Sequence, residues 1–208
     1  MGLRERKKEQ TRQLIADAAW QLFADRGFPA VTVAEIAHEA GVSTATVFNY
    51  FPTKEDLFFP RLESFGERLV EAVASRPHGE SALDAVRHVV LDTDGLLAAV
   101  ERGDAPALDR MRTISRVIAD SPALQLREQR AIAGYTAALA DVLAQEADTD
   151  GVEAWTAANA LIGVQRGLID LARRRILADE RVTEIAADVR AAGGRAFALL
   201  ERGFTKYP

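Results

Sequence analysis

Uncharged hydrogen-bonding side chains gather in a short stretch of the chain, residues 43–50. They are Ser43, Thr44, Thr46, Asn49 and Tyr50. In a helix, which turns about 100° per residue, Ala45 and Asn49 of this stretch point outward. Val47 and Phe51 point to the opposite side. An asparagine amide can form two hydrogen bonds with the edge of an adenine, and a small alanine allows close approach to the bases. These residue types at this spacing are typical of a helix that enters the major groove of DNA.

Two short helices, residues 32–40 and 43–51, are expected to position these side chains. Thr32 and Glu35 have the spacing of a capping box, in which each side chain accepts a hydrogen bond from the backbone N–H of the other. Gly41 can adopt the positive φ that the turn between the helices requires. The two helices and their turn match the helix-turn-helix pattern.

Charge is distributed unevenly along a chain whose net charge is −5. Residues 1–54 carry seven basic and six acidic side chains, a net +1, which leaves −6 on the remaining residues. Residues 1–12 alone hold five bases and two acids. A basic end on an acidic chain is compatible with a polyanion that meets one end only, although a solvated helix start would carry the same charges. Tyr50 and Lys54 are placed to contact backbone phosphates, and Thr32 can add a contact from its helix start.

Residues 9–58 resemble the DNA-binding domain of the TetR family of transcriptional repressors. The matching segments are residues 21–28, 32–37, 40–43 and 47–57. In that family the residues matching Thr32, Thr44, Thr46, Phe48, Asn49, Tyr50 and Lys54 commonly contact DNA, and Tyr50 stands where histidine is frequent. Together with the outward-facing residues, the predicted DNA contacts are Thr32, Ser43, Thr44, Ala45, Thr46, Phe48, Asn49, Tyr50 and Lys54. The alternative is a compact three-helix unit whose polar residues face water.

Helical periodicity extends over the whole chain, so the expected fold class is all-α with about nine helices. A first helix is expected over residues 5–26, and a fourth begins at a cap formed by Thr53. Pro60 either kinks this fourth helix or restarts it, and we favour a kink. Later helices are expected over residues 81–102, 104–119, 122–147, 152–177 and 182–203. The resemblance implies a helix-turn-helix domain, residues 1–58 with the motif at 32–51, and a helical ligand-binding and dimerisation domain, residues 59–208.

Small residues in the last two expected helices predict a dimer interface. A glycine inside a helix costs about 1 kcal/mol relative to alanine, and close helix crossing can offset that cost. We expect these helices to pair with their counterparts in a two-fold, four-helix interface. The residues expected there are Ala160, Gly163, Gly167, Ala186, Gly193 and Gly194. The alternative is that the two helices pack within their own chain.

The resemblance also implies a small-molecule ligand in the second domain. The side chains that could line its pocket are Phe65, His88, Met111, Tyr135, Trp155, Asn159, Gln165 and Arg166. Each of these residues could equally be an ordinary core or surface residue. We expect a ligand to tilt the fourth helix near Pro60 and so to change the spacing of two DNA-binding domains in a dimer.

The sequence lacks the residues that several other functions require. The chain has no cysteine, which excludes disulfides, thiolate metal sites and a cysteine nucleophile. Residues 146–151 begin like a calcium loop, but Ala157 stands where a bidentate glutamate is required. The sequence holds no phosphate-binding loop, nucleophile motif, metal or cofactor site, signal peptide or membrane-spanning apolar run.

The sequence therefore predicts a cytoplasmic, non-enzymatic transcriptional regulator. We expect a homodimer that represses by binding a pseudo-palindromic operator, with half-sites about 34–36 Å apart, and that is released by a small-molecule ligand. Two alternatives remain open. One is a helical protein–protein adaptor that has lost DNA reading, and the other is a small enzyme that uses a cavity of the second domain.

Overall fold

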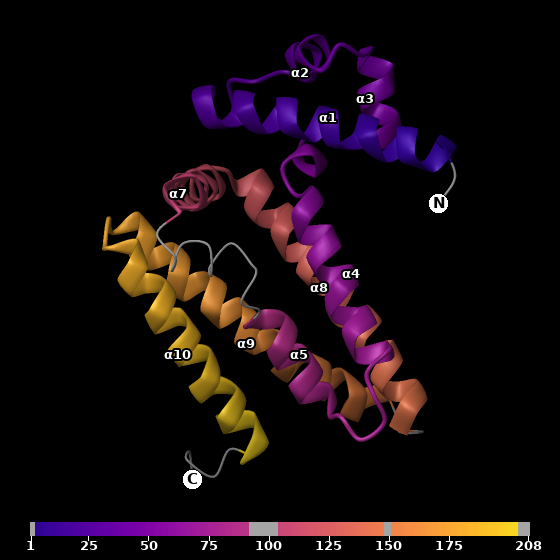
Figure 1. Ribbon diagram of the computed structural model, residues 1–208, viewed down its shortest axis with the longest axis vertical. Coiled ribbons are helices and arrows are strands. Elements are labelled where there is room, and N and C mark those ends of the chain that lie inside the picture. The colour runs from indigo at the N-terminus through magenta and orange to yellow at the C-terminus, as the bar shows by residue number, and fades with distance from the viewer. Residues whose placement is uncertain (1–2, 92–103, 148–150, 204–208) are drawn as a thin grey trace. The chain divides into compact units, whose positions relative to one another are not determined.

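The computed structural model of the chain describes residues 3–91, 104–147 and 151–203, and within these ranges it contains nine α-helices, one 3-10 turn and no strand. The elements are α1 (Leu3–Arg26), α2 (Val33–Glu39), α3 (Thr44–Tyr50), the turn η1 (Glu55–Leu57), α4 (Pro60–Ala74), α5 (Ala82–Val90), α7 (Ala105–Ala119), α8 (Pro122–Ala147), α9 (Gly151–Leu177) and α10 (Val182–Glu201) (Figure 1). The expected all-α fold is confirmed.

Two compact units make up the chain. Unit 1 comprises residues 1–63 and 116–129, and unit 2 comprises residues 64–115 and 130–208. Helices α4, α7 and α8 each have residues in both units. The expected domain boundary between residues 58 and 59 stays a prediction.

Aromatic side chains hold the elements of unit 1 together. α1 packs against α2 and η1, and α2 packs against α3. Gly27, at φ +77°, ends α1 in the left-handed conformation that glycine adopts without strain. The rings of Phe23 and Phe28 on either side of this turn have centroids 5.0 Å apart, and Phe58 after η1 lies 6.0 Å from Phe23. All three rings are buried, and burial of a side chain of this size contributes about 1.5–3 kcal/mol.

The start of α2 is closed by the predicted capping box. The Thr32 N–H donates to Glu35 Oε2 at 2.8 Å, and the Glu35 N–H donates to Thr32 Oγ1 at 3.3 Å. Arg26, the last residue of α1, adds an ion pair of 2.8 Å with Glu35. The hydrogen bonds from the backbone and hydroxyl of Thr32, and then the Arg26 guanidinium, lower the pKa of Glu35 to about 2. One carboxylate thus joins the end of α1 to the start of α2.

The segment after α3 differs from the expected fourth helix. Thr53 closes a 3-10 turn, because its N–H and its hydroxyl donate to Asp56 Oδ2 at 2.9 and 2.7 Å. α4 begins only at Pro60, so the favoured kink was wrong and the alternative, a restart of the helix at this residue, is found. Proline has no N–H, and the first residue of a helix does not use one, so a proline starts a helix without losing a hydrogen bond.

The later helices agree with expectation except over residues 81–102. There α5 ends at Val90, and the Leu91 N–H donates to Arg87 O at 2.9 Å as the cap. The rest of that expected helix lies outside the described residues.

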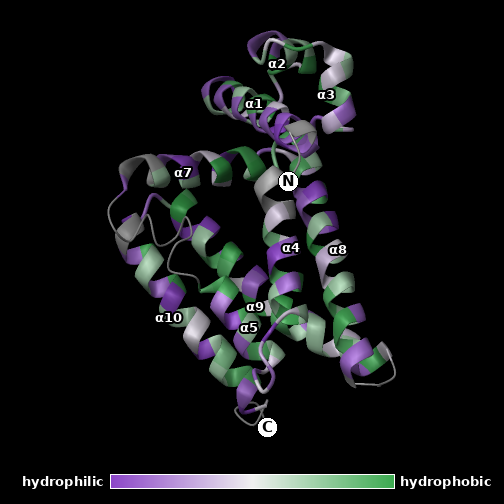
Figure 2. Cartoon of the chain, turned by 45° about the vertical axis from the view of Figure 1, so that its right-hand side comes forward, coloured by the Kyte–Doolittle hydropathy of each residue, from purple (hydrophilic) through white to green (hydrophobic). Residues whose placement is uncertain are grey.

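In unit 2, α9 and α10 pack side by side (Figure 1). Each carries hydrophobic and hydrophilic residues on different parts of its surface (Figure 2). Their shared core contains Leu168, Ile176, Ile185, Ala186 and Val189. Arg175 closes the connection between the two helices, since its guanidinium donates to Glu180 and Asp188 at 2.6 Å each. This packing lies within one chain.

α4 and α8 also approach closely in unit 2. A Cβ at Gly66 of α4 would lie 2.6 Å from Cδ1 of Tyr135 on α8, which is closer than such atoms can come. The Tyr135 hydroxyl donates to Gln165 Oε1 on α9 at 2.7 Å, and both side chains are buried. Gly66 therefore leaves the space that the Tyr135 ring needs to keep this hydrogen bond.

Gly66→Ala is expected to destabilise unit 2, because the added methyl group forces the Tyr135 ring to move. Overpacking of this kind costs about 1–3 kcal/mol. The control is Gly134→Ala on α8, where a Cβ meets no atom within 4 Å and where alanine should stabilise the helix by about 0.5–1 kcal/mol. Urea unfolding followed by circular dichroism measures both changes. Equal unfolding midpoints for the two variants would contradict this packing.

Glu35→Gln is expected to change stability in a pH-dependent way. The pKa of Glu35 falls on folding from its ordinary value of 4.5 to about 2, so its charge stabilises the fold above pH 4.5. That stabilisation is lost as the pH falls through the folded value. In thermal melts between pH 7 and about pH 2, the wild type should have a higher melting temperature than the variant near neutrality. In acid the two melting temperatures should be the same. Glu39→Gln, at the exposed far end of α2, controls for net charge. A difference in melting temperature between the wild type and Glu35→Gln that does not change with pH would contradict the lowered pKa of Glu35.

Candidate nucleic-acid interface

The inner side of α3 is fixed in the core of unit 1. Val47 is 0% exposed and Phe51, which follows the helix, is 1% exposed. The Arg12 guanidinium of α1 lies 4.9 Å from the Phe51 ring centroid, within range of a cation–π interaction. Ala45 and Asn49 are exposed. The predicted inward and outward directions are therefore confirmed for these residues, while their contacts with DNA stay predictions.

The start of α3 is held by hydroxyl groups. Ser43 Oγ accepts from the Thr46 N–H at 3.0 Å and also lies 2.7 Å from Thr46 Oγ1, with either hydroxyl as the donor. Ser43 is exposed and Thr46 is half-buried, so both remain at the surface beside Ala45. Thr44 and Phe48, the latter 47% exposed, complete the outer surface of the helix. This surface carries no charge.

Thr32 lies at the exposed start of α2. Its hydroxyl donates to Glu35 Oε2 at 2.7 Å while it accepts the bond from the Glu35 N–H. The hydroxyl is therefore already engaged in the capping box, and a phosphate would have to compete for it.

Tyr50, the last residue of α3, lines an open groove together with α1. The other residues of this groove are Glu5, Lys7, Lys8 and Thr11. The sequence analysis noted the basic excess of residues 1–12 but did not bring it next to Tyr50. The basic excess was visible in the charge count, whereas the position of Tyr50 beside it depends on how α1 crosses α3.

Lys54 is engaged inside unit 1. Its ammonium donates to Phe28 O at 2.5 Å and lies 4.3 Å from the Phe28 ring centroid. Partial burial lowers its pKa, and the negative charges of Glu55 and Glu35 oppose that shift. The predicted phosphate contact of Lys54 therefore stays a prediction that would require this ammonium to leave its partners.

Asp56 is joined to a distant part of the chain. Arg127 of α8 donates from Nε to Asp56 Oδ1 at 2.6 Å, and both side chains are largely buried. Burial alone would raise the pKa of Asp56, but the hydrogen bonds from Arg127 and Thr53 outweigh it and hold the pKa below its ordinary value. Both ends of this ion pair belong to unit 1, so the corner at residues 116–129 is part of the same unit as α3. Sequence reasoning missed this pair, whose members are 71 residues apart.

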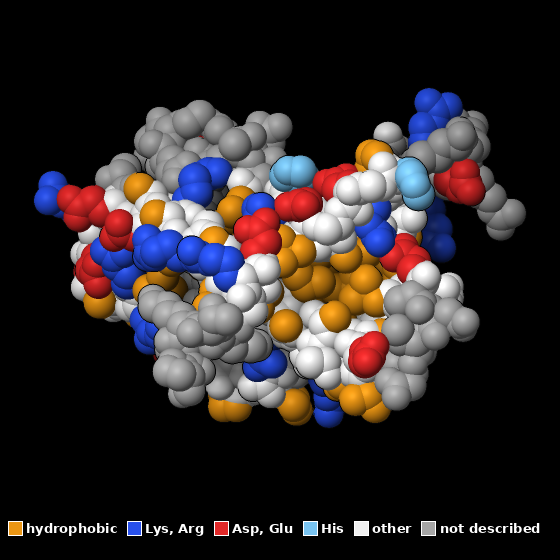
Figure 3. All heavy atoms as spheres, turned by 90° about the horizontal axis from the view of Figure 1, so that it is seen from below, with side chains coloured by type: hydrophobic (Ala, Val, Ile, Leu, Met, Phe, Trp, Pro, Cys, Tyr) orange, Lys and Arg blue, Asp and Glu red, His pale blue; other side chains and the backbone are white. Residues whose placement is uncertain are grey.

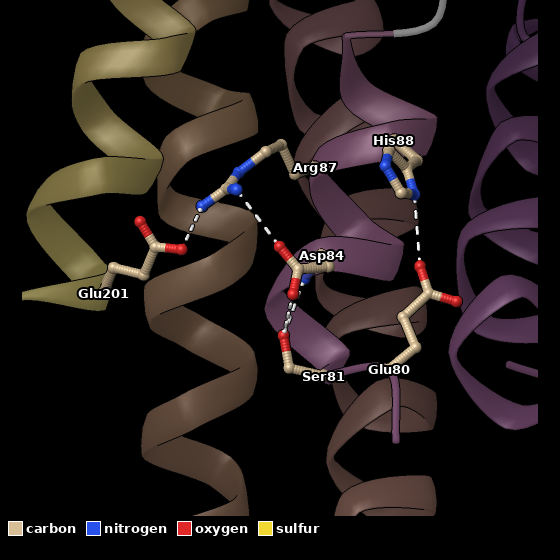
Figure 4. A network of polar contacts seen from close by, with 6 residues as sticks. All are labelled: Glu80, Ser81, Asp84, Arg87, His88 and Glu201. Carbon is tan, nitrogen blue, oxygen red and sulfur yellow. Dashed lines mark hydrogen bonds and ion pairs between the residues drawn. The ribbon is translucent and has the colours of Figure 1, made fainter. Parts of the chain in front are cut away.

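Half of the residues expected to line a ligand pocket lie at the surface. Four of them are exposed on unit 2: His88, Trp155, Asn159 and Arg166. The His88 side chain is 76% exposed and points to Glu80, with Nδ1 and Oε1 3.1 Å apart (Figure 4). In the same network Arg87 pairs with Asp84 and Glu201, which ties α5 to α10 (Figure 4). These polar groups connect surface elements of unit 2.

The other expected pocket residues lie deeper. Tyr135 and Gln165 form the buried hydrogen bond described above. Met111 packs on the core shared by α9 and α10, and Phe65 is half-buried. Viewed from below, the molecule gathers hydrophobic side chains in a recess flanked by charged ones (Figure 3). A pocket lined by the predicted set stays a prediction.

The small residues expected at a dimer interface do not share one environment. Ala186 and Gly193 are buried in unit 2, and a Cβ at Gly193 would lie 2.6 Å from Leu91 Cδ2 and 3.1 Å from Leu168 Cδ1. These two residues serve packing within the chain, as the alternative reading expected, and present no surface to a partner. Gly194 beside them is exposed, with no atom within 4 Å of its Cβ position.

An apolar groove on α9 and α10 contains the other three expected residues. It is lined by Ala160, Gly163 and Gly167 of α9, by one valine and two leucines of the same helix, and by two alanines and two leucines of α10. A Cβ at Gly163 or Gly167 would meet no atom within 4 Å. These glycines are therefore not explained by packing inside the chain.

Two further properties bear on the class of protein. In the ranges that the structure describes, no helix is long and apolar enough to cross a membrane. The same residues contain no group of three or more histidine, aspartate or glutamate side chains arranged to hold a metal ion.

Comparison with known proteins identifies the relatives of unit 1. The family model described as "Bacterial regulatory proteins, tetR family" matches residues 15–59. The chain is 34% identical over 85 residues to the HTH-type transcriptional regulator TcmR of Streptomyces glaucescens, covering 41% of this chain and 38% of TcmR. It is 27% identical over 124 residues to the nucleoid occlusion factor SlmA of Pasteurella multocida, covering 58% of each chain. The chain thus spans less than two thirds of the length of either relative.

A longer match extends beyond unit 1. The chain is 30% identical over 144 residues to MftR, a transcriptional regulator of Mycobacterium tuberculosis, covering 67% of both chains. Among solved structures, NalD of Pseudomonas aeruginosa has a TM-score of 0.56 at 18% identity, covering 90% of this chain and 97% of NalD. SmeT in complex with triclosan has a TM-score of 0.59 at 18% identity, covering 91% of this chain and 90% of SmeT. These structures share the fold. The chain belongs to the TetR family of bacterial regulatory proteins.

Proposed function

We propose that this protein is a DNA-binding transcriptional regulator that reads an operator with the outer side of α3. One observation carries the proposal: Ala45 and Asn49 are exposed while Val47 and Phe51 are buried directly behind them. An uncharged helix surface with one amide and several hydroxyls fits the major groove, where the amide can pair with an adenine edge. Thr44, Thr46 and Phe48 surround this amide and would contact bases or the adjoining backbone.

The proposed regulator acts as a two-fold dimer. Every residue that lines the groove on α9 and α10 is a glycine, alanine, valine or leucine. A continuous apolar surface of this kind marks an interaction site, and open glycines permit two helices to cross closely. A second copy of the chain would supply the same two helices and close a four-helix interface. Two α3 helices could then read a pseudo-palindrome.

A small molecule bound in unit 2 is the proposed signal. SmeT, which shares the fold, has a solved structure as a complex with triclosan, and NalD is described as the secondary repressor of a multidrug efflux pump. By analogy, we propose that this chain represses transcription and that a ligand releases it from DNA. Its proposed place of action is the cytoplasm, where its DNA would lie. The alternative, a protein–protein adaptor that no longer reads DNA, agrees less well with an exposed Asn49 on a firmly anchored helix.

Asn49→Ala is expected to relax the preference at one base pair of each half-site, because the amide that pairs with the base edge is lost. The affinity for the preferred duplex should fall by about 1–3 kcal/mol. Selection from a random duplex library, followed by titration of the selected sequence, measures both effects. The matched control is Asn159→Ala, which removes an exposed amide from α9 of unit 2. An unchanged base preference in Asn49→Ala would show that α3 reads DNA through other residues.

Gly163→Arg is expected to separate the dimer, because a long charged side chain would fill the apolar groove. Light scattering should give twice 22.6 kDa for the wild type and 22.6 kDa for the variant. Gly134→Arg is the control, since this position is also open but lies on α8. A Gly163→Arg protein that remains dimeric would place the interface elsewhere.

A further inference from the structure

A single carboxylate, that of Asp56, holds the turn that follows α3. Its Oδ2 accepts from the Thr53 N–H at 2.9 Å and from the Thr53 hydroxyl at 2.7 Å, and its Oδ1 accepts from Arg127 Nε at 2.6 Å. The bonds to Thr53 stay within the turn, whereas the bond to Arg127 joins the turn to α8. The Asp56 and Arg127 side chains are 21% exposed or less. Their contact is therefore largely shielded from water.

Arg127 belongs to a corner of unit 1, residues 116–129, where α7 ends and α8 begins. The corner is closed by its own hydrogen bonds. Gln125 Nε2 donates to the last two carbonyl oxygens of α7 at 3.2 and 2.9 Å, and Ser121 Oγ accepts from the Leu124 N–H at 3.3 Å. Leu124 is 0% exposed. Because the helix ends have partners for their backbone groups and a buried side chain beneath them, the corner gives Asp56 a firmly held partner.

The turn that Asp56 holds comes directly after the DNA-reading helix. Phe51 is the C-cap of α3, and Thr53 begins the turn two residues later. A helix as short as α3 takes its orientation from the residues that anchor its ends. Without the bond from Arg127, Asp56 would keep only its bonds to Thr53, and the turn would lose its tie to the corner. The second end of α3 would then be held less firmly than the first.

We propose that Arg127 is a positioning residue for DNA binding, which acts through Asp56 on the end of α3. The inference rests on the proposed function of α3. It extends the DNA-binding unit to the corner at residues 116–129, beyond the residues 15–59 that match the family model. A helix that is already fixed loses less freedom on binding, so a loosened α3 has a lower affinity for DNA. The base preference stays the same, because the residues that read bases are unchanged.

The two charges of the pair allow positioning to be distinguished from a simple charge effect. Asp56→Asn removes a negative charge from unit 1, which by charge alone would strengthen binding to a polyanion. Positioning requires the opposite result. One oxygen of Asp56 becomes an amide nitrogen, which cannot accept the bond from Arg127 or those from Thr53. Arg127→Gln weakens binding on either explanation, so the direction of the change in Asp56→Asn is decisive.

The test is a double-mutant cycle with the full-length protein and a duplex enriched from a random library by the wild type. Arg127→Gln and Asp56→Asn should each bind this duplex roughly tenfold more weakly, at a temperature where circular dichroism shows both to be folded. The double variant should bind little more weakly than either single variant, because both changes break the same bond. Selection with each single variant should return the wild-type base preference.

A matched ion pair in unit 2 controls for general loss of stability. Arg76 pairs with Glu146 at 2.5 Å, and their side chains are 18% and 37% exposed. Arg76→Gln should lower the melting temperature, as Arg127→Gln does, and leave the affinity for DNA unchanged. Arg127→Lys keeps the charge but not the planar donor group, so its affinity should lie between those of the wild type and Arg127→Gln. It carries the test if Arg127→Gln does not fold.

The possible results separate this inference from the proposed function. An Asp56→Asn protein that binds the enriched duplex as tightly as the wild type, or more tightly, would overturn the positioning role and leave α3 as the reader of DNA. An equal loss of affinity in Arg76→Gln would also overturn it, because stability alone would then explain the effect. A wild-type protein that enriches no duplex would refute the proposed function itself.

Discussion

The burial of Val47 and Phe51 determines what the opposite side of α3 can do. A helix of seven residues is too short to be stable alone in water, so its orientation depends on its anchor rather than on its own hydrogen bonds. Two fully buried side chains, each worth about 1.5–3 kcal/mol, set that orientation. The cap at Ser43 and the cation over the Phe51 ring hold the two ends. Asn49 consequently has a fixed direction before any DNA is present, which lowers the entropic cost of binding.

Charged groups in unit 1 join segments that are far apart in sequence. Arg26 joins α1 to α2, Lys54 joins the turn after α3 to the turn after α1, and Asp56 joins η1 to α8 through Arg127. These pairings hold α2, which precedes α3, and residues 51–57, which follow it. α8 then continues into unit 2, where Tyr135 packs against Gly66 of α4.

Local signals in the sequence predicted much of this arrangement, because their physical causes are local. The capping box of Thr32 and Glu35, the glycine after α1 and the two sides of α3 depend on residues within one or two turns of each other. Contacts over long sequence distances escaped prediction. Nothing near Lys54 shows that its ammonium meets a carbonyl 26 residues away, and nothing near Gly193 shows that Leu91 occupies the space beside it. Pro60 was misread because a proline that starts a helix and one that kinks it have the same sequence neighbourhood.

Photo-cross-linking from position 45 tests the central claim most directly. A photoreactive side chain in place of Ala45 projects from the outer surface of α3, and the same group in place of Trp155 on α9 is also exposed, in unit 2. If α3 enters the major groove, irradiation with the selected duplex should attach position 45 to a base and leave position 155 free. Adducts from position 155 alone, or none from position 45 under conditions where the duplex is bound, would contradict the account.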